Sequence, residues 1–134
     1  MQNLLVFLID DDIDDQEIFE MALKEVQPLA RCVFAGDGIF ALEKLRSDAS
    51  FLPHIIFIDI NMPRMNGIQF LSEIKRSSSF YHIPAFMYST SAEDSIVKEC
   101  LKIGASGFIK KDVYVDALQN QLVQVLRQIN KYSG

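Results

Sequence analysis

Short apolar runs alternate with segments of helical periodicity along this chain, and that alternation limits the fold more than any other feature of the sequence. The apolar runs cover residues 4–9, 30–35, 54–58, 84–89 and 107–110. The segments that follow them, with apolar residues recurring every three or four positions, are 18–26, 37–45, 68–76, 92–104 and 115–129. Uninterrupted apolar runs are typical of strands covered on both faces, and alternating strands and helices form parallel sheets with right-handed crossovers. The sequence therefore predicts an α/β fold with a doubly wound, five-stranded parallel sheet.

No repeat, linker or low-complexity tract interrupts this pattern, so we expect a single domain over residues 1–134. The net charge of −5 argues against nucleic acid as a partner. No apolar stretch approaches the roughly 18 residues of a membrane span, and no basic region precedes the first apolar run, as it would in a signal peptide. Cys32 and Cys100 form no CxxC pair, which favours reduced thiols. We therefore expect a cytoplasmic protein that binds no membrane.

Five of the six residues from Asp10 to Asp15 are aspartates, directly after the first apolar run. Two carboxylates about 4 Å apart repel each other by roughly 4 kcal/mol at an effective dielectric constant near 20, so their crowding needs compensation. A helix start compensates part of it, because Asp11 or Asp12 can cap the helix. Asp14 and Asp15 then face the positive end of the helix dipole. A divalent cation would compensate the rest.

Polar residues with related chemistry follow most of the predicted strands. They are Asp10, Asp11 and Asp12 after the first strand, Asp59 and Asn61 after the third, Ser89, Thr90 and Ser91 after the fourth, and Lys110 and Lys111 after the fifth. Ligands of open parallel sheets bind beyond the carboxyl ends of the strands, so we expect these groups to converge at one edge. Carboxylates suit Mg²⁺, a carboxylate can attack phosphorus, and a lysine with a hydroxyl can hold phosphoryl oxygens. The sequence therefore predicts a magnesium and phosphate site there.

Four segments resemble the receiver domain of two-component response regulators. "LIDDD" resembles the acidic pair after that family's first strand, and "DINMPRMNG" matches its D-x-x-M-P-x-M-x-G acceptor loop at every fixed position. "YSTS" lies where the family has Ser or Thr, thirty residues past the acceptor, and "GASGFIKK" resembles the segment that ends in the family's lysine. The resemblance covers residues 4 to about 130 and implies the flavodoxin-like (βα)5 receiver fold.

The resemblance also implies an acceptor and a metal site. Asp59 matches the aspartate that is phosphorylated. Asp10 and Asp11 match the acidic pair, with Asp11 as the direct ligand of Mg²⁺ and Asp10 acting more through water. Asp59 itself and the backbone carbonyl of Asn61 would complete the metal site.

Two further residues match groups that hold the phosphoryl oxygens in the family. Lys111 matches the lysine and Ser89 the hydroxyl, with Lys110 and Thr90 as the alternatives one position away. Ser89 and Phe108 match the residues that move on activation, and a static core position is the other interpretation of Phe108. The family usually has proline after its lysine, where this chain has Asp112.

The implied function is phosphorelay signalling by a stand-alone receiver. A sensor histidine kinase or a histidine phosphotransfer protein would supply the phosphoryl group, and an unidentified downstream protein would receive the signal. Only 23 residues follow Lys111, so we expect no output domain and signalling through protein contacts or phosphate relay. The chain would be a self-phosphorylating acceptor with intrinsic dephosphorylation and not a turnover enzyme.

Three alternatives remain open at this level. A magnesium-dependent phosphohydrolase of the haloacid dehalogenase type would have D-x-D around its nucleophile, where this chain has Asn61 at the second position. A flavodoxin-like electron carrier would have a Ser-, Thr- or Gly-rich phosphate loop in place of the aspartates after the first strand. A receiver-shaped interaction module that is never phosphorylated is the third.

Overall fold

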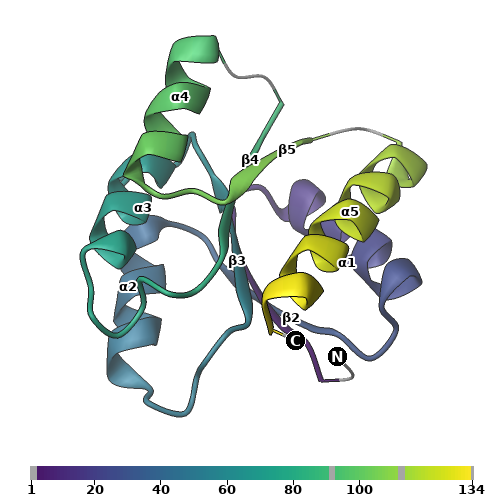
Figure 1. Ribbon diagram of the computed structural model, residues 1–134, viewed down its shortest axis with the longest axis horizontal. Helices are drawn as coiled ribbons and strands as arrows, with labels where there is room; N and C mark the ends of the chain where they lie inside the picture. The colour runs from purple at the N-terminus through teal and green to yellow at the C-terminus, as the bar shows by residue number, and fades with distance from the viewer. Residues whose placement is uncertain (1–2, 91–92, 112–113, 134) are drawn as a thin grey trace.

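Strands and helices alternate along the computed structural model, which describes residues 3–90, 93–111 and 114–133 (Figure 1). The strands are β1 (Leu5–Ile9), β2 (Arg31–Ala35), β3 (Ile55–Asp59), β4 (Ala85–Ser89) and β5 (Gly107–Lys110). The helices are α1 (Ile13–Val26), α2 (Gly38–Ser47), α3 (Gly67–Lys75), α4 (Asp94–Ile103) and α5 (Val115–Ser133).

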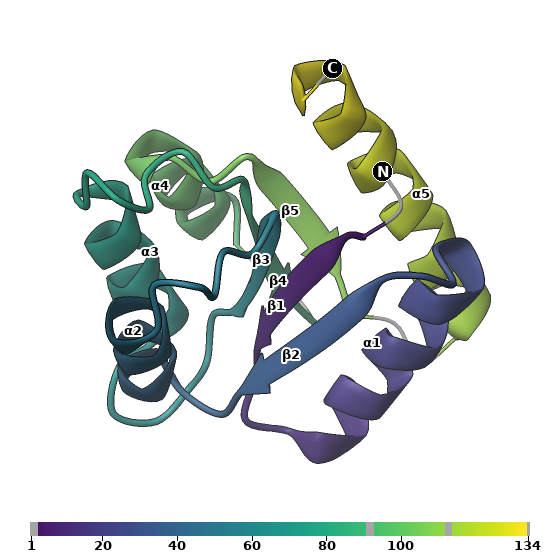
Figure 2. The same cartoon turned by 90° about the horizontal axis from the view of Figure 1, so that it is seen from below.

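All five strands belong to one parallel sheet with the order β2-β1-β3-β4-β5. The helices cover both faces: α1 and α5 lie on one side of the sheet, and α2, α3 and α4 on the other (Figures 1 and 2). The helix after β1 (α1) and the helix after β3 (α3) lie on opposite faces, and the strand order reverses between β1 and β3. The prediction of a doubly wound five-stranded sheet is confirmed.

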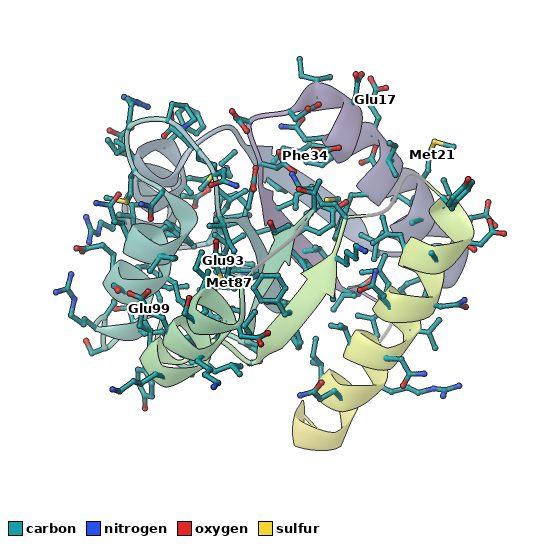
Figure 3. All side chains as sticks on the ribbon, turned by 90° about the horizontal axis from the view of Figure 1, so that it is seen from above. Glu17, Met21, Phe34, Met87, Glu93 and Glu99 are labelled. Carbon is teal, nitrogen blue, oxygen red and sulfur yellow. The ribbon has the colours of Figure 1, made fainter. Side chains whose placement is uncertain are left out.

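Each face of the sheet has its own apolar core, which explains why the strands are apolar at nearly every position. In β3, Ile56 and Ile58 pack toward α2, α3 and α4, whereas Phe57 packs toward α1 and α5. The Phe19 ring of α1 meets the Phe57 ring edge-on, with their centroids 4.9 Å apart. Figure 3 shows the opposite side of α1, where Glu17 projects into solvent.

The start of α1 differs from the sequence prediction. The helical periodicity begins at residue 18, but α1 begins at Ile13, because the acidic segment itself forms the first turn. Asp12 is the N-cap, and its carboxylate accepts hydrogen bonds from the backbone N–H groups of Asp14 and Asp15. Such a cap satisfies donors that have no partner within the helix. Of the two capping candidates, Asp12 therefore takes the role and Asp11 does not.

Candidate functional site

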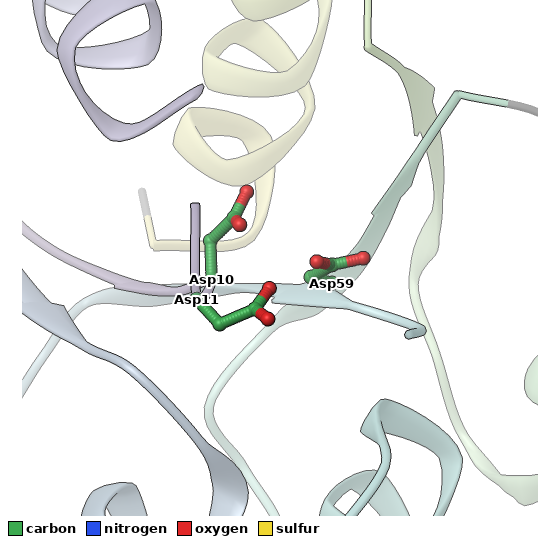
Figure 4. A group of neighbouring side chains, drawn as sticks. All are labelled: Asp10, Asp11 and Asp59. Carbon is green, nitrogen blue, oxygen red and sulfur yellow. The ribbon is translucent and has the colours of Figure 1, made fainter. Parts of the chain in front are cut away.

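Three carboxylates meet at the carboxyl ends of β1 and β3. The two strands are neighbours with Ile9 opposite Ile58, so the residues that follow, Asp10 and Asp59, are brought side by side. Asp10, Asp11 and Asp59 each offer an oxygen within 4.8 Å of the others. Asp10 is fully buried and Asp59 is 5% exposed, whereas Asp11 is exposed and its carboxylate reaches toward Asp59 (Figure 4).

The turn between β1 and α1 separates the roles of the consecutive aspartates. The backbone N–H of Asp12 donates to Asp10 Oδ1 over 2.9 Å, which turns the chain away from the sheet. The Asp12 carboxylate is occupied at the helix start, 2.9 Å from the backbone nitrogen of Asp14. The structure therefore directs Asp10 and Asp11 to the cluster and Asp12 to the helix.

The loop after Asp59 is folded tightly against β3. The backbone N–H of Asn61 donates to Asp59 Oδ1 over 3.1 Å, and that of Gly67 donates to the Ile60 carbonyl over 2.9 Å. A Cβ atom on Gly67 would lie 2.1 Å from the Asp59 carbonyl oxygen, so only glycine fits where α3 begins. The absence of a side chain at Gly67 therefore allows the acceptor loop to pack against the backbone of Asp59. The Asn61 carbonyl remains a predicted metal ligand.

An ion pair ties the same loop to α2. Arg64, the non-glycine residue with positive φ (64°) among those described, places its guanidinium 2.6 Å from Asp37 Oδ2. The other oxygen of Asp37 caps α2 by accepting from the backbone N–H of Phe40 over 2.8 Å. Asp37 therefore both caps α2 and pairs with the loop that follows Asp59.

Lys111 supplies the positive charge of the site. Its Nζ lies 2.9 Å from Asp10 Oδ2, 3.3 Å from Asp59 Oδ2 and 2.9 Å from Asp15 Oδ2. The alternation of the strand explains the choice between the two lysines, because Lys111 continues the face of Ile109, which packs toward α1 and α5. Lys110 is exposed.

The contact between Asp15 and Lys111 was not predicted from the sequence, where the position of Asp15 indicates only a helix start. The signal was present in the helical period. Asp15, Phe19 and Leu23 are spaced by four residues, and Phe19 and Leu23 are buried, so Asp15 lies on the inward stripe of α1.

Burial and charge together set the ionisation of the pocket. Burial raises the pKa of the Asp10 carboxyl to about 6, although Lys111 and the Asp12 N–H act in the opposite direction. Burial also raises the pKa of Asp59, and Lys111 offsets part of that rise. For Lys111, burial disfavours the ammonium, but the contacts with Asp10 and Asp15 outweigh burial and raise the pKa. The pocket thus gathers more carboxylates than its one ammonium neutralises.

The hydroxyl and aromatic candidates lie on the two neighbouring strands. Ser89 is the last residue of β4 and is buried, whereas the alternative Thr90 is exposed. The Ser89 carbonyl accepts from the Lys111 backbone N–H over 2.8 Å, so the two residues sit at one level. Phe108 is partly buried against the core on the face of the sheet that α2, α3 and α4 cover. Asp112, which replaces the family's usual proline, lies outside the described residues.

The residues present suit a hard divalent cation. Oxygen donors from two or three carboxylates are what Mg²⁺ takes from proteins, with water in its remaining positions. Asp10 Oδ2 is enclosed and, among the described residues, accepts no hydrogen bond in good geometry, although the Lys111 ammonium is its ion-pair partner. An enclosed carboxylate oxygen without a hydrogen-bond donor suits coordination of a cation or a hydrogen bond from a water molecule bound to that cation. The structure thus contains an acidic cluster with the oxygen donors of a magnesium site.

Comparison with known families decides the identity of the fold. Residues 6–123 match the response regulator receiver domain. The chain belongs to this family. Receiver domains serve in phosphorelay signalling, accept phosphoryl groups from histidine kinases and interact with downstream proteins. The acidic pocket of this receiver domain is consistent with that function.

Curated relatives contain receivers in several settings. The receiver is 33% identical over 113 residues to the protein-glutamate methylesterase/protein-glutamine glutaminase of Treponema denticola, covering 83% of this chain but 29% of that protein. It is 31% identical to the two-component response regulator ORR3 of Oryza sativa subsp. indica, covering 81% of this chain and 79% of that protein. The chain spans about a quarter to a half of the length of several curated relatives that it matches.

Solved structures share the fold over nearly the whole receiver. The phosphorylated cyanobacterial phytochrome response regulator RcpA superposes with a TM-score of 0.83 at 24% identity, covering 92% of this chain and 91% of that one. The Vibrio cholerae chemotaxis protein CheY4 gives 0.77 at 25% identity, covering 91% and 98%. Within the part of the receiver that the structure describes, no helix is both long and apolar enough to cross a membrane.

Proposed function

We propose that this receiver accepts a phosphoryl group on Asp59 from a phosphohistidine of a histidine kinase or a histidine phosphotransfer protein. One observation carries the proposal: Asp59 ends a central strand beside Asp10 and Asp11, with the Lys111 ammonium 3.3 Å from its carboxylate. That is a nucleophile with its charge-compensating groups already in place.

The transfer follows from the chemistry of these groups. An oxygen of the Asp59 carboxylate attacks phosphorus in line, the new O–P bond forms as the P–N bond to imidazole breaks, and the imidazole leaves. Asp10, Asp11, Asp59 and the Asn61 carbonyl would hold Mg²⁺, which would neutralise negative charge on the transferring group. Lys111 and the Ser89 hydroxyl hold phosphoryl oxygens. Water later hydrolyses the acyl phosphate and restores the carboxylate.

The same contacts provide a switch. A phosphoryl group on Asp59 draws Lys111 and Ser89 toward it. Ser89 ends β4 and Lys111 directly follows β5, and these two strands precede and follow α4 in the chain. Phe108, partly buried two strands from Asp59, adjusts to the new position of Ser89. Phosphorylation shifts the equilibrium between an inactive and an active arrangement of this region only if the phosphoryl group makes more favourable contacts in one arrangement than in the other. The signal then passes through protein contacts, without a turnover reaction by this receiver.

Acetyl phosphate with Mg²⁺ tests the acceptor. Mass spectrometry is expected to find one added phosphoryl group on the wild-type protein and none on Asp59→Asn, because the amide is not a nucleophile. Asp48→Asn is the control, since Asp48 is an exposed aspartate at the end of α2. Equal labelling of Asp59→Asn and wild type would remove Asp59 from the role.

Removing magnesium tests the metal site in the same assay. A chelator is expected to suppress labelling of the wild type strongly, and Asp11→Asn is expected to require far more Mg²⁺ than the wild type. Labelling that is indifferent to the chelator would contradict the assignment of the acidic pair to the metal.

A further inference from the structure

Lys111 has a carboxylate partner that belongs to neither the metal cluster nor the acceptor loop. Asp15, on the first turn of α1, accepts a hydrogen bond from Lys111 Nζ over 2.9 Å. The two residues are 96 positions apart in sequence. Asp15 is not among the carboxylates that surround the candidate cation position.

The surroundings of Lys111 leave little room for a further partner. An ammonium has three N–H donors, and three carboxylates lie within 3.3 Å of Nζ. The Lys111 side chain is 9% exposed, and the Tyr88 ring centroid is 5.1 Å from Nζ. A phosphoryl oxygen that binds Lys111 therefore competes with these carboxylates for the same ammonium.

Asp15 is the partner whose replacement is least costly. Asp10 is enclosed, and its carboxylate would be left without its countercharge inside the protein. Asp59 carries the phosphoryl group itself. The Asp15 side chain is 29% exposed, so water can solvate it once Lys111 departs.

We propose that Asp15 is a positioning residue that competes with the phosphoryl group for Lys111 and so weakens the phosphorylated state. The proposal rests on the proposed function of Asp59 as the acceptor. In the unphosphorylated receiver, Asp15 holds Lys111 toward α1. On phosphorylation, Lys111 exchanges the Asp15 carboxylate for a phosphoryl oxygen, and the ion pair between α1 and the end of β5 is lost.

Beryllofluoride, which mimics a phosphoryl group on aspartate, measures this competition at equilibrium. The affinity of each variant is measured by NMR titration at saturating Mg²⁺. Asp15→Asn is expected to bind beryllofluoride about three- to tenfold more tightly than the wild type, because each factor of ten corresponds to about 1.4 kcal/mol and one charged hydrogen bond no longer has to be exchanged.

Two matched variants separate the contact from general charge and from structure. Asp14→Asn removes the same charge from the same exposed helical turn, without a contact to Lys111 among the described residues. Asp15→Glu keeps the carboxylate and is expected to retain the wild-type affinity. Both controls are expected to stay within about twofold of the wild type, and thermal unfolding by circular dichroism checks that each variant is folded.

The outcomes distinguish this inference from the proposed function. A wild type that fails to bind beryllofluoride overturns the acceptor role of Asp59 and the competition with it. Wild-type binding with an unchanged or weaker affinity for Asp15→Asn overturns the competition alone. Equal tightening by Asp14→Asn and Asp15→Asn also overturns it, because net charge then explains the effect.

Discussion

Lys111 is the residue on which the unliganded pocket depends, since its ammonium is the positive charge between Asp10 and Asp59. The sequence placed a lysine at this point in two possible registers. The pleat of β5 decides between them, because it turns Lys111 toward α1 and leaves Lys110 exposed. The sequence motif therefore predicted a lysine, and the face of the sheet on which each lysine lies determined that Lys111 enters the pocket.

We expect Lys111→Ala to destabilise the receiver by about 3–5 kcal/mol in the absence of Mg²⁺, because buried carboxylates lose their countercharge. Added Mg²⁺ is expected to recover part of the loss by neutralising the same carboxylates. Urea unfolding with and without Mg²⁺ measures both effects.

Lys110→Ala is the matched control for that experiment. Lys110 is exposed, and its backbone, not its ammonium, exchanges two 2.8 Å hydrogen bonds with the side-chain amide of Gln121. This variant is expected to stay within about 0.5 kcal/mol of the wild type. A Lys111→Ala protein that is as stable as Lys110→Ala would contradict the role of Lys111 in the pocket.

At the scale of single elements, most boundaries were predictable because caps and periodicity act over one helical turn. The acidic segment was recognised as a helix start, yet α1 begins at Ile13 and not where the apolar stripe begins. The start of α3 was set by features that the pattern did not reveal: a capping box between Asn66 and Gln69, and the close approach of Gly67 to Asp59. A sequence pattern does not measure how near two backbone segments come.

Gly67→Ala tests that approach. The added Cβ would meet the Asp59 carbonyl oxygen at 2.1 Å, so we expect a loss of about 2 kcal/mol in the free energy of unfolding. We also expect slower labelling by acetyl phosphate, because the backbone of Asp59 has to move.

Gly36→Ala is the comparison, since nothing lies within 4 Å of a Cβ at that position. It is expected to be neutral, or to stabilise the receiver by up to about 1 kcal/mol by restricting the unfolded chain. Equal stabilities of Gly67→Ala and Gly36→Ala would show that the acceptor loop relaxes freely.

At the scale of the whole molecule, the sheet is enclosed by two helical layers, and this burial also suppresses thiol ionisation. Burial raises the pKa of Cys32 to about 12, with the negative charge of Glu20 adding to the rise. Burial likewise raises the pKa of Cys100. Both thiols are free in the structure.

These shifts make the receiver less stable at alkaline pH. In the unfolded chain a cysteine loses its proton near pH 9, whereas folded Cys32 keeps it until about pH 12. Between these values the unfolded state binds fewer protons, so the free energy of unfolding falls as the pH rises, by up to about 1.4 kcal/mol per pH unit and thiol. Below pH 9 the contribution of this thiol is fully present.

Urea unfolding at about pH 8, 9.5 and 10.5 measures how the free energy of unfolding depends on pH. In Cys32→Ala we expect this free energy to fall less steeply with pH than in the wild type. The slope, and not the absolute stability, is the measured quantity, because the substitution also removes packing. Identical slopes for the two proteins would show that Cys32 ionises equally in the folded and unfolded states.

The sequence by itself determined the succession of strands and helices and the chemistry at the strand ends. Both follow from local rules, because periodicity and capping act over a few residues, and parallel strands bring all their carboxyl ends to one edge. The placement of Asp10 and Asp59 in one pocket follows from that rule once the strands are recognised.

Only the tertiary structure decided which distant groups touch. Three contacts join segments whose separation in sequence gives no information about contact. They are the Asp15–Lys111 hydrogen bond, the Arg64–Asp37 ion pair, and the hydrogen bond from the Lys110 backbone to the Gln121 side chain. Each depends on how a helix is rotated and shifted over the sheet, which is set by packing of the whole core. A pattern of neighbouring residues does not contain that rotation.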